Sequence, residues 1–190
     1  MKKMKRLTVV FFVLAALLAV LAVSFAAYTS LSSAKRVVTV KGTEQLFTSD
    51  VLQEYQNDSQ IQTRVISFGE EDKVFSVTVS NHLQGDTTKY DTKNIPYNFQ
   101  VELLDVDGNR VTDENVYTGL SVNNTTMASN PVTISDRVLK AGEAQDQTYT
   151  FRLADTALLN YRIKITANTT RSEYKSLGRI IAFTTNTTTT

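Results

Sequence analysis

The sequence contains no cysteine and only one histidine among its 190 residues, and these two scarcities remove several classes of protein. Without cysteine the chain has no disulfide scaffold, no thiolate zinc site, no iron–sulfur cluster and no cysteine nucleophile. The single histidine, His82, leaves little for histidine-based metal binding or acid–base catalysis. We therefore expect a protein that is not an enzyme and that has neither a metal nor another cofactor.

The chain also lacks a marked excess of either charge, with 20 Lys and Arg residues against 19 Asp and Glu. We see no basic patch that would suit a nucleic-acid partner. Hydrophobic residues make up 42% of the chain and charged residues 21%, which is enough apolar material for a folded core. The length fits one domain with an appendage.

The N-terminus has the pattern of an export signal. Four cationic residues within positions 2 to 6 precede an almost uninterrupted apolar run, Leu7–Tyr28. The run is long enough to cross a bilayer as a helix, which fits a retained anchor. Ser24 and Ala26 also supply the small residues that a signal peptidase prefers at positions −3 and −1. Residues 1–28 are therefore either a signal peptide or a transmembrane anchor.

The distribution of positive charge predicts on which side of the membrane the domain lies. The four cations before the apolar run outnumber Lys35 and Arg36 behind it, which places the N-terminus in the cytoplasm and the rest outside. An exported domain without disulfides is typical of a Gram-positive type of bacterial surface. We expect an extracellular or cell-surface protein, either secreted or held to the membrane by residues 1–28.

Beyond residue 29 the dominant pattern is an alternation of apolar and polar residues, which predicts half-buried β-strands. The clearest predicted strands are Lys73–Ser80, Tyr97–Leu104, Thr148–Leu153 and Tyr161–Ala167. Weaker candidates are Arg36–Lys41, Gln62–Phe68, Val116–Ser121, Pro131–Ile134 and Leu177–Phe183. A short helix is predicted near Ser49–Leu52, where Ser49 or Asp50 can cap free backbone N–H groups.

Short strands separated by turn residues such as Gly85-Asp86 predict two antiparallel sheets packed face to face. The predicted fold is all-β, an immunoglobulin-like antiparallel β-sandwich over residues 29–183, preceded by an N-terminal hydrophobic export or anchor helix. Residues 184–190 are Thr-rich and too polar to pack, so they are predicted to form a disordered tail.

One motif resembles a metal site. If Gly108 is position six of a calcium loop, Asp105, Asp107 and Glu114 fall at positions three, five and twelve. Leu103 stands where the first carboxylate belongs, and Asp-Gly is a standard hairpin signal. A hairpin turn is favoured, and calcium binding stays open.

Two other residue types need an interpretation. His82 lies in a turn-rich segment without a helical partner, which predicts a solvated loop residue. The chain has eight tyrosines, several of them in or beside predicted strands. Most are predicted to be core residues whose hydroxyls reach the edge of the sandwich, and the alternative is that exposed rings stack on sugars or on a partner surface.

The segment Ala26-Ala27-Tyr28-Thr29-Ser30 ends the export helix, and an isolated strand and a cysteine-free, Thr-rich β domain follow it. In these features the chain resembles the camelysin and biofilm-fibre proteins of Gram-positive spore formers. The resemblance implies extracellular fibres in which each subunit lends an N-terminal strand to the sandwich of its neighbour.

The segment Lys35–Lys41 is the one best placed for such an exchange, because its core of Val37, Val38, Thr39 and Val40 strongly favours β structure. It can complete its own sandwich as an edge strand or add to the exposed edge of a neighbour. We expect an exported, non-enzymatic structural protein of the cell surface, a fibre or envelope-assembly subunit whose partner is itself or another surface protein. The alternative is an extracellular, adhesin-like module that binds carbohydrate or protein.

Overall fold

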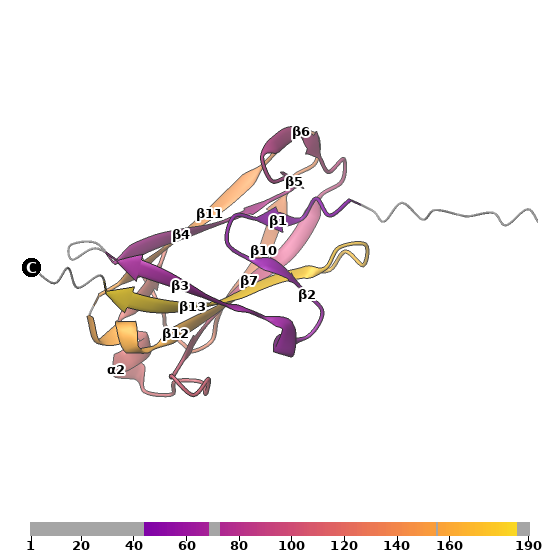
Figure 1. Ribbon diagram of the computed structural model, residues 1–190. Coiled ribbons are helices and arrows are strands. Elements are labelled where there is room, and N and C mark those ends of the chain that lie inside the picture. The colour runs from indigo at the N-terminus through magenta and orange to yellow at the C-terminus, as the bar shows by residue number, and fades with distance from the viewer. Residues whose placement is uncertain (1–43, 69–72, 155, 186–190) are drawn as a thin grey trace, which may run out of the picture. The chain divides into compact units, whose positions relative to one another are not determined.

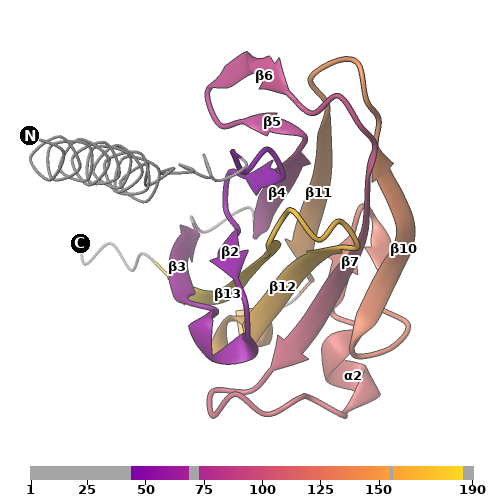
Figure 2. The same ribbon diagram turned by 90° about the vertical axis from the view of Figure 1, so that its right-hand side faces the viewer.

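The computed structural model describes residues 44–68, 73–154 and 156–185, and it shows an all-β domain (Figures 1 and 2). One sheet consists, in order, of β1 (Thr48–Ser49), β4 (Val74–Ser80), β11 (Asp146–Leu153), β8 (Leu120–Val122) and β9 (Thr125–Thr126). The second consists of β10 (Val132–Leu139), β7 (Ile95–Leu104), β12 (Arg162–Thr169), β13 (Ser176–Thr185) and β2 (Gln53–Tyr55), with β3 (Thr63–Phe68) also paired to β13.

Three short helical elements and a small ribbon complete the described part of the chain. The ribbon is formed by β5 (His82–Leu83) and β6 (Asp86–Tyr90), and the helical elements are η1 (Asp58–Gln60), α2 (Glu114–Tyr117) and η2 (Thr156–Asn160). All strand pairs in the described ranges are antiparallel except β3 and β13, which run parallel.

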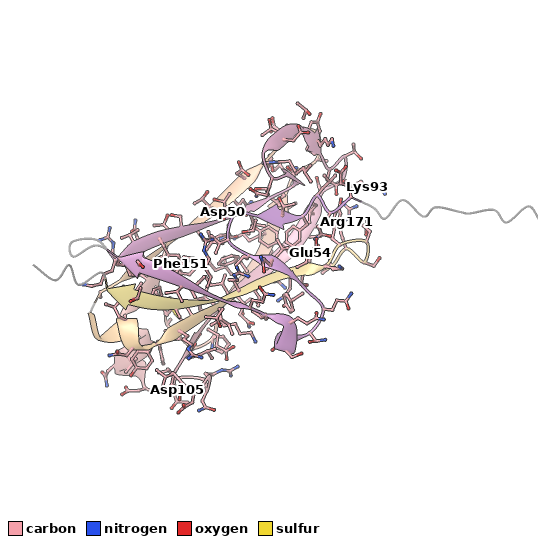
Figure 3. The ribbon with its side chains drawn as sticks, viewed as in Figure 1. Asp50, Glu54, Lys93, Asp105, Phe151 and Arg171 are labelled. Carbon is pink, nitrogen blue, oxygen red and sulfur yellow. The ribbon has the colours of Figure 1, made fainter. Side chains whose placement is uncertain are left out.

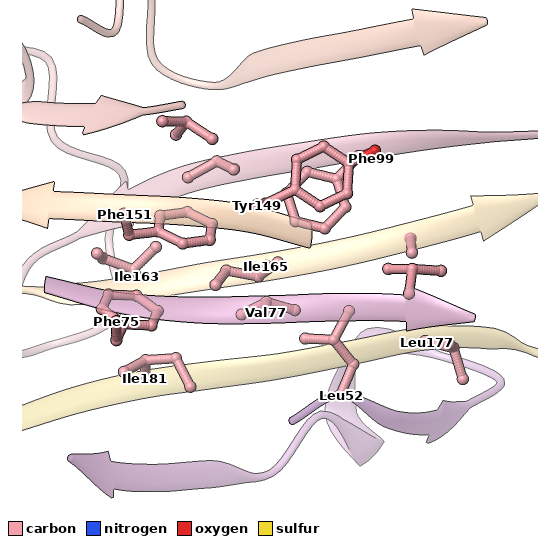
Figure 4. Packing of buried hydrophobic residues seen from close by; sticks show 14 of the residues in the cluster. Leu52, Phe75, Val77, Phe99, Tyr149, Phe151, Ile163, Ile165, Leu177 and Ile181 are labelled. Atoms are coloured by element: carbon pink, nitrogen blue, oxygen red, sulfur yellow. The ribbon is translucent and has the colours of Figure 1, made fainter. Parts of the chain in front are cut away.

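The two sheets pack face to face around one core, as in a β-sandwich (Figure 4). The alternation in the four clearest predicted strands is confirmed, because their inward side chains are buried: Phe75, Val77, Val79, Tyr97, Phe99, Val101, Leu103, Tyr149, Phe151, Leu153, Ile163, Ile165 and Ala167. Rings from opposite sheets are in contact, since Phe99 of β7 stacks on Tyr149 of β11 with centroids 3.6 Å apart. Burial of each large side chain is worth roughly 1.5–3 kcal/mol, so this interface stabilises the fold.

Three of the weaker strand predictions are confirmed by β3, β10 and β13. β13 continues to Thr185, two residues past the expected end of the sandwich at residue 183. The prediction for Val116–Ser121 is wrong in its first half, which belongs to α2. Asp113 caps that helix by accepting a hydrogen bond from Asn115 N at 3.0 Å, and β8 begins only at Leu120.

The predicted helix near Ser49–Leu52 is also wrong. Ser49 Oγ does accept hydrogen bonds from Val51 N and Leu52 N, at 3.3 and 3.2 Å, as a helix cap would. The chain then extends into β2, because Leu52 is drawn into the core and is only 4% exposed. The capping bonds therefore make a turn that carries the chain from one sheet to the other. The predicted strand Arg36–Lys41 lies outside the described residues.

Candidate functional site

β3 is an edge strand that is paired on one side only. It pairs with β13, and no other strand in the described part of the chain pairs with it (Figure 1). Ile180 N donates to Gln62 O, so the backbone groups of Gln62 point toward β13. Because these groups alternate in direction along a strand, the N–H and C=O groups of Thr63, Val65 and Ser67 point away from β13. Val65 is also 61% exposed. The outer edge of β3 can therefore accept a further strand.

β4 forms an edge of the other sheet, but less of it is open. β1 covers only the last two residues of β4. Asp50, just after β1, accepts a hydrogen bond from Thr78 N at 2.7 Å, so a carboxylate takes the place of a partner strand there. By alternation, Val74 and Ser76 are the remaining outward positions of β4 without a strand partner in the described ranges. Of the two edges, β3 offers the longer run.

Phenylalanine rings fill the space between the β3 and β4 edges. Phe68, at the end of β3, stacks on Phe183 of β13 with ring centroids 5.3 Å apart. Phe75 of β4 lies 5.9 Å from Phe183 and 4.6 Å from Phe151 of β11, which Figure 3 marks. Phe68 and Phe75 are buried and Phe183 is partly buried. Side chains therefore close the core at this side of the sandwich, and none of the described strands pairs with the outer backbone edge of β3.

A groove of about 590 Å³ lies where the chain crosses from β1 to β2. Phe47, Leu52 and Leu177 contribute apolar side chains to its walls, and Gln53 and Ser49 contribute polar ones. A concave surface that combines apolar walls with a few polar groups is suited to a small polar ligand or an extended peptide.

The prediction that His82 is a solvated loop residue is wrong. His82 lies in β5 and is 6% exposed, with Nε2 2.9 Å from Asp146 Oδ1 and Nδ1 3.0 Å from Leu83 O. Ser80 Oγ donates to the same oxygen of Asp146. Because Ser80 and His82 both bind the carboxylate and not each other, this cluster holds no serine nucleophile activated by histidine. Its contacts instead join β4, β5 and β11.

The hairpin interpretation of the Asp105 motif is confirmed. Leu104 and Arg110 form a β-bridge, and Asp105 N donates to Asn109 O at 2.8 Å. Asp105 Oδ1 accepts hydrogen bonds from Asn109 N and Asp107 N, and these bonds, chiefly the one from Asn109, hold the pKa of the Asp105 carboxyl below its usual range. The carboxylate that the calcium alternative needs is thus engaged by the amides of its own turn. Within the described ranges, no three His, Asp or Glu side chains are grouped so as to hold a metal ion.

A buried ion-pair cluster connects the loop after β6 to the hairpin between β12 and β13. Asp91 is 5% exposed and accepts hydrogen bonds from Arg171 Nη1 at 2.7 Å and from Tyr174 Oη at 2.6 Å. Arg171 also pairs with Glu173, and Figure 3 shows it beside Lys93. Burial, together with the hydrogen bond to Asp91, raises the pKa of Tyr174. The cluster satisfies its own charges, which indicates a structural role.

Comparison with known families gives a match over most of the sequence. The profile of DUF7288, a family of unknown function, matches residues 9–176. The chain belongs to the DUF7288 family. Comparisons with curated proteins and with solved structures give no match. The DUF7288 match takes in most of the hydrophobic run, the predicted assembly segment and the sandwich up to the start of β13.

The sites predicted in the N-terminal part of this DUF7288 chain lie outside the described residues. They are the signal-peptidase positions Ser24 and Ala26 and the assembly strand Val37, Val38, Thr39 and Val40. Residues 44–68, 73–154 and 156–185 contain no helix that is long and apolar enough to cross a bilayer. The open edge of β3 was not identified from the sequence, because alternation indicates a strand but not which of its sides lacks a neighbour.

Proposed function

We propose that this protein is an exported, non-enzymatic structural protein of the cell surface, and that its copies assemble into a fibre or envelope layer by strand pairing at the edge of β3. The observation that carries the proposal is the run of outward backbone groups at Thr63, Val65 and Ser67. Edges that must not pair usually carry proline or charged side chains. Arg64 is the only charged residue of β3, and the positions with outward backbone groups, Thr63, Val65 and Ser67, carry neither a charge nor a proline. Val65 is also exposed.

The order of strand pairings supports an immunoglobulin-like sandwich. In the constant-type immunoglobulin fold, strands A, B, E and D form one sheet and C, F and G the other. Here β1, β4, β11 and β8 are neighbours in one sheet, and β7, β12 and β13 are neighbours in the other. In chain order these seven strands correspond to A through G, and β10 is an addition beside β7.

The donor in this proposal is the segment Val37–Val40 of a neighbouring copy. Gln45 Nε2 donates to Lys175 O at 3.1 Å. Lys175 lies five residues before Ile180, the first residue of β13 that pairs with β3. The open edge Thr63–Ser67 therefore lies about 16 to 30 Å away along the strand. The donor segment precedes Gln45 by five to eight residues, which span at most about 18 to 29 Å when fully extended. Pairing within one chain would require a nearly fully extended connection, whereas donation to a neighbour has no such requirement.

Two further features support the proposal. The cationic start and the apolar run favour export, with the domain outside. The single histidine shares the carboxylate of Asp146 with Ser80 instead of activating that hydroxyl, which favours a non-enzymatic role.

A second candidate function is a binding module for carbohydrate or for another protein. The groove between β1 and β2 favours it, because side chains such as Gln53 and Ser49 place amide and hydroxyl groups beside apolar walls. In that case the protein stays monomeric and a ligand occupies the groove.

Electron microscopy of the purified full chain tests the assembly proposal, in detergent if the hydrophobic run is retained. The key variant is Val65→Pro, because the Val65 N–H points away from β13 and its loss removes no hydrogen bond of the sheet. Val65→Thr keeps this N–H and is the matched control. A third variant lacks residues 28–41.

We expect filaments from the unaltered chain and from Val65→Thr. We expect folded monomers, and no filaments, from Val65→Pro and from the deletion. If the deletion destabilises the domain while Val65→Pro still assembles, residues 36–41 are an ordinary first strand of the same sandwich. Absence of filaments from the unaltered chain also contradicts assembly.

A further inference from the structure

Two arginines that have no carboxylate partner among the described residues face the same space at the open side of the sandwich. Leu177 and Ile181 of β13 are buried in the core, and alternation places Arg179 between them on the same inward face. Arg64 of β3 is in register with Ile181, so it projects to that face as well. In the described part of the chain, neither guanidinium takes part in an ion pair.

The surroundings of Arg179 leave part of its hydrogen-bonding capacity unused. Nη1 donates to the side-chain oxygens of Gln53 and Gln62. The Nε atom is buried and has no hydrogen-bond partner, and it is the only such side-chain N or O atom among the described residues. Burial, and then the charge of Arg64, lower the pKa of Arg179. An anion beside both arginines would offset this repulsion between the two charges.

This pair of arginines lies next to the groove between β1 and β2. Gln53, which binds Arg179, and Leu177, two positions before it on β13, both line that groove of about 590 Å³. Figure 4 shows Leu52, Leu177 and Ile181 along the same side of the core. Arg179 does not itself line the groove, and its hydrogen bond to Gln53 is what connects it to the groove wall.

We propose that this side of the sandwich binds an oxyanion, the carboxylate, phosphate or sulfate group of a ligand, between Arg64 and Arg179. Hydrogen bonds from guanidinium groups to the oxygens of such a group are charge-assisted and strong. Nη2 of Arg179 can donate to one of these oxygens, because Gln53 and Gln62 engage only Nη1 and Nη2, unlike Nε, is not buried. Arg64 supplies the second guanidinium. The bound anion also offsets the repulsion between the two arginines. The site uses the side chain of Arg64, whereas the assembly proposal uses the outward backbone groups of Thr63, Val65 and Ser67 on the same strand.

Calorimetry and thermal unfolding with inorganic phosphate test the proposal, with chloride at equal ionic strength as the reference. Glutarate provides a second arm that separates a preference for phosphate from one for carboxylate. At 100 times the dissociation constant, a single site raises the melting temperature of a domain of this size by roughly 5–10 °C.

The variants for this test are Arg179→Met and Arg64→Gln, with the exposed Arg152→Gln on β11 as the matched control. We expect the first two to weaken anion binding at least tenfold and the control to leave it unchanged. In chloride alone, Arg179→Met should melt at or above the temperature of the unaltered chain, because it removes an unpaired cation.

Three results would overturn the proposal. One is the absence of any anion-dependent shift in the unaltered chain. Another is an equal shift in all four proteins, which would indicate a general effect of the salt on protein stability. The third is a loss of stability in Arg179→Met in chloride together with unchanged anion affinity, which would make Arg179 a purely structural residue.

Discussion

At the scale of single residues, the buried tyrosines place polar groups inside the core and satisfy them there. Tyr97 and Tyr149 come from opposite sheets, and their hydroxyl oxygens are 2.8 Å apart. Tyr97 also donates to Gln147 Oε1 at 2.7 Å. Both rings are almost fully buried, which confirms the predicted core location for these two tyrosines.

These tyrosines make the stability of the domain depend on alkaline pH. Burial raises the pKa of both hydroxyls, so they stay protonated in the folded chain when tyrosines of the unfolded chain, with pKa about 10, ionise. Their contribution to the free energy of unfolding is fully present below pH 10. It is lost as the pH rises further, at about 1.4 kcal/mol per pH unit for each tyrosine.

We predict that Tyr97→Phe reduces the slope with which the free energy of unfolding falls above pH 10 by about 1.4 kcal/mol per pH unit. At pH 7 the same substitution lowers the free energy of unfolding by about 1–2 kcal/mol, because hydrogen bonds are lost. Urea unfolding between pH 7 and 11.5 measures both effects. An alkaline slope identical to that of the unaltered chain would contradict the assignment of Tyr97.

The remaining polar contacts of the core could not be predicted from the sequence, because their partners are distant along the chain. His82 binds Asp146, 64 residues away, and Asp91 binds Arg171, 80 residues away. Composition marks such residues as polar and therefore exposed, and only the pairing of β4 with β11 and of β12 with β13 brings the partners together. For the same reason the sequence did not reveal Arg179, which has no ion-pair partner among the described residues.

At the scale of elements, alternation located the strands because one face of each strand is buried. The alternation of apolar and polar residues did not predict the short elements correctly. Ser49 makes the hydrogen bonds of a helix cap, and whether a helix or a strand follows is decided by the burial of Leu52. The same limit applies to α2, which is only four residues long.

The pairing of β13 with β2 depends on a glycine covered by an aromatic ring. A Cβ at Gly178 would lie 3.0 Å from Cδ1 and Cε1 of Tyr55 and 3.2 Å from Cδ1 of Ile61. The Tyr55 ring is held in place, because its hydroxyl donates to Asn168 Oδ1 at 2.6 Å. The ring cannot move away without losing this bond.

We predict that Gly178→Ala destabilises the domain by about 1–3 kcal/mol, as measured by chemical denaturation. The same substitution in a Tyr55→Ala background should cost less, because the obstructing ring is gone. Equal costs in the two backgrounds would show that the Tyr55 ring is not the cause.

At the scale of the whole molecule, the proposed assembly depends on two separated features of one chain. The segment that is predicted to form the donor strand precedes the described domain, and the proposed accepting edge lies on β3. Because the chain has no cysteine, single cysteines can be introduced at both places without competing thiols. Residues on adjacent strands have Cα atoms close enough for a disulfide, about 4.4–6.8 Å apart.

The most direct measurement mixes two preparations, one carrying Val65→Cys and the other carrying a cysteine at one of the positions Val37, Val38, Thr39 or Val40. Val106→Cys, at another exposed valine, replaces Val65→Cys as the control. On oxidation, the account predicts disulfide-linked dimers of the two different chains for at least one donor position, and none with the control. A further preparation carries Val65→Cys and the donor cysteine in one chain. Disulfides formed only inside that chain, with no linked dimers in the mixture, would contradict the account.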